Sequence, residues 1–499
     1  MDDLNRLKAL SAEIMDIQNA TALLGWDQQT YMPSGGAEDR GDAISTLSNL
    51  IHQKITSPEM GQLLENLRSL QAGLDPDSDD ARLIKISRRD YEKRVKVSSE
   101  WVVEFAKVTT LAHSSWQEAK AKSDFSIFQK HLEKIVSLRR DYSSFFAPFD
   151  HVYDPQLDDF EPGMKTAEVQ AIFNQVRPVQ VSLIKRITGQ TAVDDSFMRK
   201  KYDEKDQWNF GVEVITRFGY DWNHGRQDKS VHPFTQGFGI GDVRITTRVE
   251  PERMATALFG TMHEAGHALY ELGIDRSLRR TPLASGASMA LHESQSRMWE
   301  NLVGRSLSFW KFFYPRFKEV FPDQVANVSL ATFYRGINRV QPSLIRVEAD
   351  EATYNLHIML RMELEIALLE GSLAVKDLPQ AWNQRMREYL GVLPPNDTLG
   401  VLQDVHWSGG SFGYFPTYAL GNLVSAQLWE VIQKDLPNLD SQIAHGEFSE
   451  LLAWLRQHLH RHGAKFEPQE MVQKITGSKI NPQPYLLYLQ AKYGEIYHL

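Results

Sequence analysis

Apolar residues recur at spacings of three and four along most of this chain, the pattern of helices that bury one face. The first such run begins at Leu4 and continues to Leu24, and Gly25 marks its expected end. The charged stretch at 80–146 predicts two or three long amphipathic helices. Further helices are predicted at 166–188, 324–338, 349–369, 378–390, 419–434 and 448–461. The sequence therefore predicts a mainly α fold.

Residues 232–248 break this pattern. The stretch is rich in glycine and threonine, and in residues 242–247 the side chains Val, Ile and Thr alternate with Asp, Arg and Thr. This predicts a short strand beside a glycine-rich turn. A lone strand in a helical protein often lines a cleft, where an extended peptide can pair with its edge. We therefore expect a small β-region beside the functional site.

The chain shows no sign of separate domains. No internal repeat, low-complexity tract or Pro/Ser-rich linker interrupts its 499 residues. A chain of this length is enough for one large domain or about three average ones. Because the proline-containing stretches at 75–80 and 393–397 read as surface turns, we predict a single helical domain over residues 1–499, with two lobes around a groove.

The composition excludes several classes of protein. The chain has no cysteine, so any metal must be bound by His, Asp and Glu, and no disulfide or thiolate site is possible. Its 55 basic and 64 acidic residues give a net charge of −9, which argues against a nucleic-acid partner. The start of the sequence has no signal-peptide pattern, and no uncharged apolar run reaches the roughly 18 residues of a membrane helix. We expect a cytoplasmic protein that binds neither nucleic acid nor membrane.

The most specific motif is His263-Glu264-Ala-Gly266-His267, which lies in a helix-like segment. Residues four apart lie about one turn apart on the same helix face, so both imidazoles can reach one metal ion. Glu264 is then placed to accept a proton from a water that the metal activates. Gly266 costs a helix about 1 kcal/mol relative to Ala, and we attribute it to close packing beneath the site.

A catalytic zinc needs a third protein ligand. Glu271 is the nearest carboxylate, but three ligands on successive turns would span about 12 Å at 1.5 Å per residue, so Glu271 is assigned a supporting role. Glu293 lies 26 residues after His267 on another predicted helix, far enough to return alongside the first. Because adjacent helical residues point about 100° apart, only one of His292 and Glu293 should face the metal. We predict Glu293, with His292 as the alternative.

Several motifs occur in an order typical of one peptidase family. As they stand here, they are His232-Pro-Phe234, Asp242-Val-Arg-Ile-Thr246, His263-Glu-Ala-Gly-His267, His292-Glu-Ser-Gln295, Ile345-Arg-Val-Glu-Ala-Asp350 and Gly400-Val-Leu-Gln-Asp-Val-His-Trp407, preceded by Trp26-Asp-Gln-Gln-Thr-Tyr-Met-Pro33. With these motifs the chain resembles the carboxypeptidase Taq family of metallocarboxypeptidases over nearly its whole length. The resemblance implies a mostly helical fold with a deep substrate groove, a homodimer, and release of single C-terminal residues from peptides.

A carboxypeptidase must bind the free carboxylate of its substrate, and the planar fork of arginine suits this contact. On the resemblance, Arg346 is the first candidate, beside Asp350, which we expect to hold it in place, and Arg244 is the second. The resemblance also suggests that His232 and Asp242 help to shape the closed end of the groove.

A glycine-rich loop that carries tyrosines, at 407–418, precedes a predicted helix. Neutral hydrogen-bond donors are needed where the oxyanion of the tetrahedral intermediate develops. His406, Tyr414 and Tyr418 supply such groups, in an arrangement similar to that of distantly related helical zinc dipeptidases. We rank Tyr418 above Tyr414.

Together these observations predict a metal-dependent carboxypeptidase of broad specificity, with Glu264 as base and then acid. One divalent ion is expected per subunit, zinc first and cobalt second, because His and carboxylate ligands admit several metals. Two alternatives stay open. One is a related helical zinc oligopeptidase or dipeptidyl carboxypeptidase, and the other is a non-catalytic helical metal-binding protein. A C-terminally amidated peptide separates the first two readings, since only a carboxypeptidase should fail to cleave it.

Overall fold

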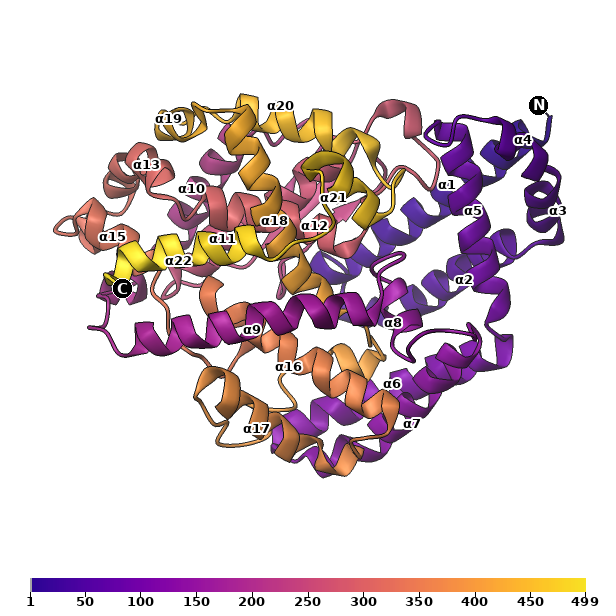
Figure 1. Ribbon diagram of the computed structural model, residues 1–499, viewed down its shortest axis with the longest axis horizontal. Helices are drawn as coiled ribbons and strands as arrows, with labels where there is room; N and C mark the ends of the chain where they lie inside the picture. The colour runs from indigo at the N-terminus through magenta and orange to yellow at the C-terminus, as the bar shows by residue number, and fades with distance from the viewer. Residues whose placement is uncertain (1) are drawn as a thin grey trace. The chain divides into compact units, whose positions relative to one another are not determined.

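Helices joined by short turns make up most of the computed structural model, which describes residues 2–499 (Figure 1). The chain forms two compact units. Unit 1 comprises Met1–Val95, Asp194–Ile337 and Leu428–Gly477, and unit 2 comprises Lys96–Val193, Asn338–Gln427 and Ser478–Leu499. The predicted mainly α fold is confirmed. The single domain with a groove between two lobes stays a prediction.

Unit 1 contains the first helices, the sheet and the helices that pack on the sheet. Its helices are α1 (Asp2–Thr30), α2 (Ala37–Ile55), α3 (Pro58–Asn66), α4 (Arg68–Gly73), α5 (Asp79–Lys96), α10 (Glu204–Phe218), α11 (Met254–Leu272), α12 (Met289–Arg297), α13 (Leu307–Val320), α14 (Pro322–Val325), α15 (Leu330–Ile337), α19 (Leu439–Ala444), α20 (Ser449–His458) and α21 (Pro468–Thr476). The apolar stripe of α1 packs with Leu63, Leu64 and Ile84 in one core.

The first helix does not end at Gly25, as the sequence predicted, but continues to Thr30. A glycine inside a helix costs only about 1 kcal/mol relative to Ala. The next residue, Trp26, is only 5% exposed. Burying this large side chain offsets that cost, so the helix runs through the glycine.

The sheet has three strands, in the order β1-β3-β2. β1 (Gln227–Lys229) is parallel to β3 (Val243–Thr247), and β2 (Thr235–Gly237) is antiparallel to β3, with Gln236 opposite Arg244. Val243 and Ile245 are fully buried, and α11 packs against β2 and β3. The small β-region is therefore confirmed beside the helix that carries the His-Glu-x-x-His motif, although the sequence indicated one strand rather than three.

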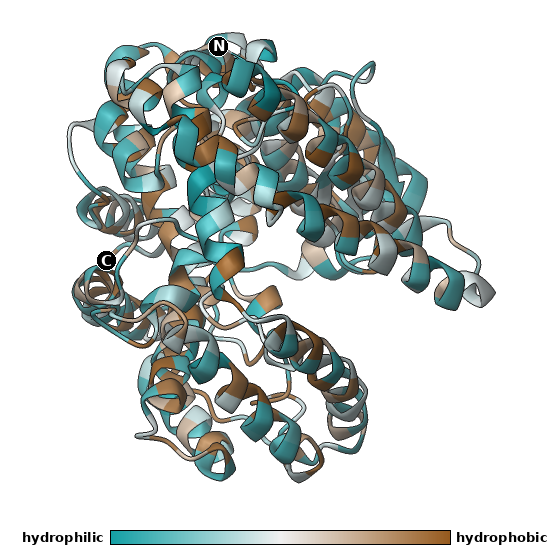
Figure 2. Cartoon of the chain, turned by 90° about the vertical axis from the view of Figure 1, so that its right-hand side faces the viewer, coloured by the Kyte–Doolittle hydropathy of each residue, from teal (hydrophilic) through white to brown (hydrophobic). Residues whose placement is uncertain are grey.

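Unit 2 is a set of packed helices. They are α6 (Ser99–Lys122), α7 (Phe125–Ser144), α8 (Asp154–Asp158), α9 (Thr166–Thr188), α16 (Glu351–Glu370), α17 (Leu378–Leu390), α22 (Gln483–Tyr497) and the first part of α18 (Phe415–Asp435). The last helix, α22, lies alongside α9 (Figure 1). Polar and apolar residues alternate along the helices of both units, as expected where one face is buried (Figure 2). Within residues 2–499, no helix is both long and apolar enough to span a membrane.

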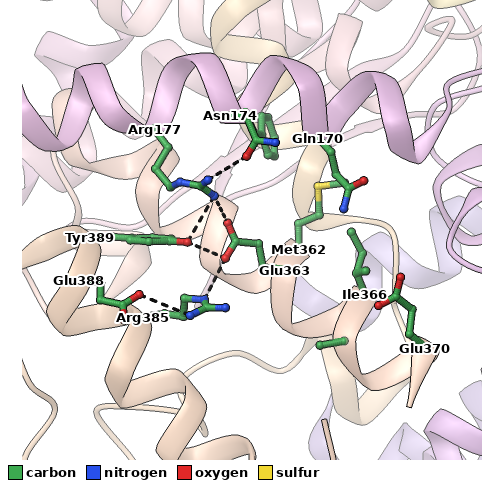
Figure 3. Close-up of a pocket in the computed structure, with 12 residues that line it drawn as sticks. Gln170, Asn174, Arg177, Met362, Glu363, Ile366, Glu370, Arg385, Glu388 and Tyr389 are labelled. Carbon is green, nitrogen blue, oxygen red and sulfur yellow. Dashed lines mark hydrogen bonds and ion pairs between the residues drawn. The ribbon is translucent and has the colours of Figure 1, made fainter. Parts of the chain in front are cut away.

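Three helices of unit 2 meet at a cluster of ion pairs around Glu363 (Figure 3). The Glu363 carboxylate on α16 accepts hydrogen bonds from Arg177 on α9 and from Arg385 (2.9 Å) and the Tyr389 hydroxyl (2.6 Å) on α17. The cluster borders an open cavity of about 550 Å³. One carboxylate thus connects all three helices.

Most of the predicted helix bounds agree with the structure, and two of the helices, α9 and α17, have the predicted first and last residues. The helix predicted at 324–338 is wrong: α14 ends at Val325, and α15 begins only at Leu330. The Ser329 hydroxyl accepts a hydrogen bond from the Thr332 amide (3.1 Å), which is how serine starts a new helix. The helix predicted at 448–461 is also shorter, because α20 ends at His458.

Close approach of α11 and α12 depends on Gly266. A Cβ atom at this position would lie 2.6 Å from the Gln295 carbonyl oxygen and 2.7 Å from the Ser296 Cα. Both are backbone atoms, which cannot move aside as the end of a flexible side chain can. The glycine therefore allows the two backbones to touch, as the sequence suggested.

We expect Gly266→Ala to destabilise the protein by about 1–3 kcal/mol, because the added methyl group overpacks a backbone contact. Urea unfolding measures the change. The matched control is Gly260→Ala in the same helix, where an added Cβ would meet nothing within 4 Å. That substitution should be neutral or stabilise by up to about 1 kcal/mol, through helix propensity alone. If both substitutions stabilise the protein equally, the backbones of α11 and α12 do not approach closely at Gly266.

Candidate metal centre

Two helices bring three donor atoms together. His263 and His267 lie on α11, and Glu293 lies on α12. The Nε2 atoms of His263 and His267 are each 3.6 Å from Oε2 of Glu293, and all three donors lie within 4.8 Å of one another. Two imidazole nitrogens and one carboxylate oxygen form a donor set that suits zinc and other divalent ions. The residues present therefore fit a divalent metal.

The other nitrogen of His263 is held by Glu300, a residue that the sequence analysis gave no role. The Nδ1 atom of His263 is 3.0 Å from Glu300 Oε2. Glu300 lies in a π-helical turn, Met298–Val303, that continues α12. Burial alone would raise the pKa of Glu300, but Arg297, His263 and Arg305 lower it to about 2. The side chain is therefore a carboxylate that can accept the Nδ1 proton of His263 and direct Nε2 to the metal.

Arg297 connects the two glutamates. Its Nε donates a hydrogen bond to Glu293 Oε1 (2.6 Å), and its Nη1 lies 3.1 Å from Glu300 Oε2. Because Oε1 of Glu293 is engaged in this way, Oε2 is the oxygen that faces the two imidazoles.

His292 supports His267. The two Nδ1 atoms are 2.7 Å apart, and His292 Nε2 is 2.7 Å from Glu271 Oε1, which also accepts a hydrogen bond from the Gly286 amide (3.1 Å). Both ring nitrogens of His292 are thus engaged away from the three donors, and this geometry favours Glu293 over His292 as the third ligand. Glu271 lies at the far end of the chain of contacts, in the supporting position that the helix geometry predicted.

Glu264 is the carboxylate best placed for proton transfer. It is 6% exposed, and its Oε2 accepts a hydrogen bond from the Thr235 hydroxyl on β2 (2.6 Å). Burial raises its pKa, and the nearby His263 and Thr235 offset only part of this rise. An elevated pKa increases the ability of a carboxylate to take up a proton near neutral pH.

Unit 2 contains a second cluster, around Asp404. Arg346 Nε donates a hydrogen bond to Asp404 Oδ1 (2.9 Å), and Arg361 Nε donates one to Oδ2 (2.7 Å). Burial alone would raise the pKa of Asp404, but the two guanidinium groups hold it far below its usual range. Two cations therefore share one anion, which leaves an excess positive charge in a buried place.

The expectation that Asp350 holds Arg346 is wrong. Asp350 instead caps α16, where its Oδ1 accepts hydrogen bonds from the amides of Ala352 and Thr353, each at 3.0 Å. The Nη1 atom of Arg346 donates to the Tyr354 hydroxyl at 3.0 Å.

The other predicted residues of unit 2 gather near Arg346. The Tyr418 hydroxyl is 3.5 Å from His406 Nε2, and the Tyr414 and Tyr418 rings are 5.2 Å apart. The Arg346 guanidinium lies 5.1 Å from the centre of the Tyr418 ring. Burial lowers the pKa of His406 to about 4, so its imidazole is neutral at physiological pH.

In unit 1, Arg244 pairs with Asp242 through two hydrogen bonds, Nε to Oδ1 (2.9 Å) and Nη2 to Oδ2 (2.7 Å). His232 does not join either cluster. Its side chain is exposed, and its backbone carbonyl accepts a hydrogen bond from the Ser230 hydroxyl (2.7 Å).

The sequence matches the carboxypeptidase Taq (M32) metallopeptidase family over residues 6–493. A thermostable carboxypeptidase 1 from Thermus thermophilus is 42% identical over 95% of each chain, and a carboxypeptidase 1 from Bacillus subtilis is 39% identical over 98% of each. The crystal structure of an M32 carboxypeptidase from Deinococcus radiodurans superposes with a TM-score of 0.97, at 40% identity over the full length of both chains. The chain belongs to the carboxypeptidase Taq (M32) family.

Membership of the M32 family confirms the prediction of a metal-dependent carboxypeptidase, rather than the oligopeptidase or non-catalytic alternatives. It also implies a divalent metal and peptide substrates. Sequence reasoning missed three residues: Glu300 and Thr235, which contact residues of the metal centre in unit 1, and Asp404, which binds Arg346 in unit 2. Two of them had a signal, since Asp404 lies inside a quoted motif and Thr235 directly follows another.

We expect Glu300→Gln to weaken zinc binding by about 10- to 100-fold, because the amide keeps the size of the side chain but loses the charge that orients His263. Competition with a chelator measures the affinity. Glu319→Gln is the control, since Glu319 lies on the exposed surface of α13. If both variants bind zinc as the unaltered protein does, Glu300 has no part in metal binding.

Proposed function

We propose that this carboxypeptidase is a zinc enzyme that removes single residues from the free C-termini of peptides, with broad specificity and with cobalt as the alternative metal. The observation that carries the assignment of the site is the convergence of three donor atoms. We assign His263, His267 and Glu293 as the ligands of one ion per subunit, because their Nε2, Nε2 and Oε2 atoms face one another within 4.8 Å. When bound, such an ion polarises a carbonyl group and acidifies water.

Glu264 is the proposed general base and then general acid. It accepts a proton from the attacking water and passes it to the nitrogen of the leaving amino acid. Two features support this role. Its burial favours the protonated form, and the hydrogen bond from Thr235 fixes the direction of one carboxylate oxygen while the other stays available.

Tyr418, and after it Tyr414, are the proposed donors to the oxyanion, together with His406. Oxyanion stabilisation needs donors that are held in place before charge develops. The neutral state of the buried His406 and the packing of the two tyrosine rings support such a role.

Recognition of the free carboxylate is assigned to Arg346 first and to Arg244 second. Around Asp404, two arginines share one carboxylate, and His406 is neutral, so the cluster carries an excess charge of one. A terminal carboxylate would balance this charge, whereas an amide or an internal peptide bond would not. Arg244 has its charge balanced by Asp242 and is better suited to directional hydrogen bonding.

The remaining features rest on the sequence. We propose that His232 and Asp242 shape the closed end of the substrate groove, and we retain the homodimer and the cytoplasmic location as predictions.

We expect Glu264→Gln to retain zinc and to lose nearly all turnover, since it keeps the shape of the side chain and removes the base. Mass spectrometry of a mixed peptide pool after incubation measures the release of C-terminal residues, and elemental analysis measures the metal.

The control for this variant is the unaltered protein after treatment with a chelator. It should be inactive, and added zinc or cobalt should restore it. Full activity without metal would contradict the proposed function. Near-normal rates in the zinc-loaded Glu264→Gln variant would mean that another group accepts the proton.

We expect Arg346→Ala to lower kcat/KM for peptides with a free carboxylate by about 30- to several-thousand-fold, because a charge-assisted contact of about 2–5 kcal/mol is lost. Any residual cleavage of amidated peptides should fall far less. Arg346→Lys should recover only part, since an ammonium group keeps the charge without the planar fork.

Arg177→Ala is the matched control, because it removes another ion-paired arginine of unit 2 that is bound to Glu363. It should leave the preference for a free carboxylate unchanged. If Arg346→Ala lowers kcat/KM equally for both kinds of peptide, Arg346 has a structural role only. Arg244 would then be tested with the same peptides.

A further inference from the structure

Two aromatic rings lie close to the guanidinium group of Arg244. Its central carbon lies 4.8 Å from the centre of the Trp26 ring and 4.8 Å from the centre of the Phe238 ring. The two rings are 6.4 Å apart and nearly perpendicular, at 88°. Cations close to aromatic faces are attracted by the ring quadrupole, most strongly by indole. Phe238 belongs to the glycine-rich turn, but Trp26 comes from the distant end of α1.

The hydrogen bonds of Arg244 leave one edge of the guanidinium group available. Asp242 occupies the edge formed by Nε and Nη2. Within residues 2–499, Nη1 has no hydrogen-bond partner, and the side chain keeps 19% of its surface exposed. With Asp242 on one edge, the guanidinium group can bind a second carboxylate bidentately through its Nη1–Nη2 edge. Asp242 and the two rings therefore restrict the direction of that edge.

Trp26 serves this arrangement through its ring face and not through its N–H group. The side chain is 5% exposed, and Nε1 is buried without a hydrogen-bond partner in the described part of the chain. An unpaired buried N–H is destabilising, and a phenylalanine would avoid it. The indole offers the cation a larger ring face than a phenylalanine would.

The end of α1 is fixed in place by contacts of its own. Arg40 on α2 donates hydrogen bonds to the Leu24 carbonyl (2.6 Å) and to the Asp27 carboxylate (2.7 Å), on either side of Trp26. The Trp26 ring is thus a fixed wall and not a mobile cover. It also contacts Arg226, 5.3 Å from the ring centre, but Arg226 is turned to Asp228.

Residues that contact Arg244 line a cavity. Phe238 and Asp242, which hold Arg244, line a cavity of about 700 Å³ whose wall also contains Thr235, the hydrogen-bond partner of Glu264. The cavity is large enough for the last residue of a peptide. A peptide end in this cavity would lie between the partner of the base and the residues that hold Arg244.

We propose that Trp26 is a positioning residue for substrate binding: it holds the Arg244 guanidinium so that its Nη1–Nη2 edge is directed at the terminal carboxylate of the peptide. This inference rests on the proposed assignment of Arg244 to substrate binding. It assigns the first helix and the Trp26–Pro33 motif a role in recognition of the terminal carboxylate. The proposed function assigned them no role.

The test measures binding without turnover. The probe is an N-blocked dipeptide in which a methylene group replaces the scissile carbonyl, prepared as the free acid and as the C-terminal amide. Calorimetry on the zinc-loaded, full-length protein gives the Kd of each form. We expect Trp26→Leu to weaken binding of the acid by about 3- to 30-fold, the range for loss of a partly desolvated cation–π contact, and binding of the amide by less than about 2-fold. Trp26→Phe should restore most of the difference, because a ring face returns.

Two further variants separate positioning from simple packing. Trp454→Leu also removes a buried tryptophan of unit 1, on α20, and should change the melting temperature without changing the ratio of the two Kd values. Adding Trp26→Leu to Arg244→Ala should not change that ratio further. The effects of two substitutions do not add when one residue acts through the other.

The outcomes distinguish this inference from the proposed function. If Arg244→Ala reduces the preference for the acid and Trp26→Leu does not, the positioning role is wrong and the assignment of Arg244 stands. If Arg244→Ala has no effect, both the assignment of Arg244 and the role of Trp26 are wrong, while the metal site and Arg346 are untouched. If Trp26→Phe recovers nothing, the ring face is not what matters, and the inference is overturned.

Discussion

The backbones of α11 and α12 touch at Gly266, and the donor set depends on this contact. A Cβ atom added at position 266 would lie 2.6 Å from the Gln295 carbonyl oxygen and 2.7 Å from the Ser296 Cα, so there is no space for a side chain. Glu293 lies less than one turn before those two atoms, so its carboxylate reaches the face of α11 that carries His263 and His267.

Two glutamates beside the same histidine have opposite environments, and this separates their roles. Glu264 has few charged partners, so burial dominates and raises its pKa. Glu300 is also largely enclosed, but Arg297 and Arg305 lie close to it and lower its pKa to about 2. A carboxylate that readily takes up a proton suits acid–base chemistry, while one that stays ionised suits the orientation of an imidazole. The arginines around Glu300 thus keep the two functions apart.

The sequence predicted what depends on local spacing and missed what depends on competition between partners. His263, Glu264 and His267 follow from the four-residue period, and α9 and α17 follow from their apolar stripes. Asp350 lies four residues after Arg346, so it was a reasonable partner from the sequence. In the structure it caps α16 instead, because the backbone amides at the start of a helix otherwise lack acceptors. The actual partner, Asp404, lies 58 residues away and cannot be found from spacing.

Glu300 lies between these cases. It is seven residues after Glu293, close to two helical turns, so a position on the same face was foreseeable. The π-helical turn that carries it was not, because a widened turn arises from packing rather than from propensity. The same limit applies to Trp26: its place in an ordered motif was visible, but its stacking on Arg244 needs a contact between α1 and a strand more than 200 residues later.

Arg346 and Arg244 are held in similar ways, each with a carboxylate on one edge and two aromatic rings close by. Arg346 has Asp404, with the Phe415 and Tyr418 rings at 5.7 and 5.1 Å, and Arg244 has Asp242, with Trp26 and Phe238. A free arginine side chain loses about 2 kcal/mol of rotamer entropy when it is immobilised, and a guanidinium already fixed in the fold avoids that loss on binding. The two differ in charge, because Arg361 adds a second cation to Asp404 whereas Asp242 faces Arg244 alone. Excess charge attracts an anion from any direction, whereas a neutral ion pair accepts one through hydrogen bonds at its open edge. Under the proposed assignments, charge favours a carboxylate at Arg346, and direction favours one at Arg244.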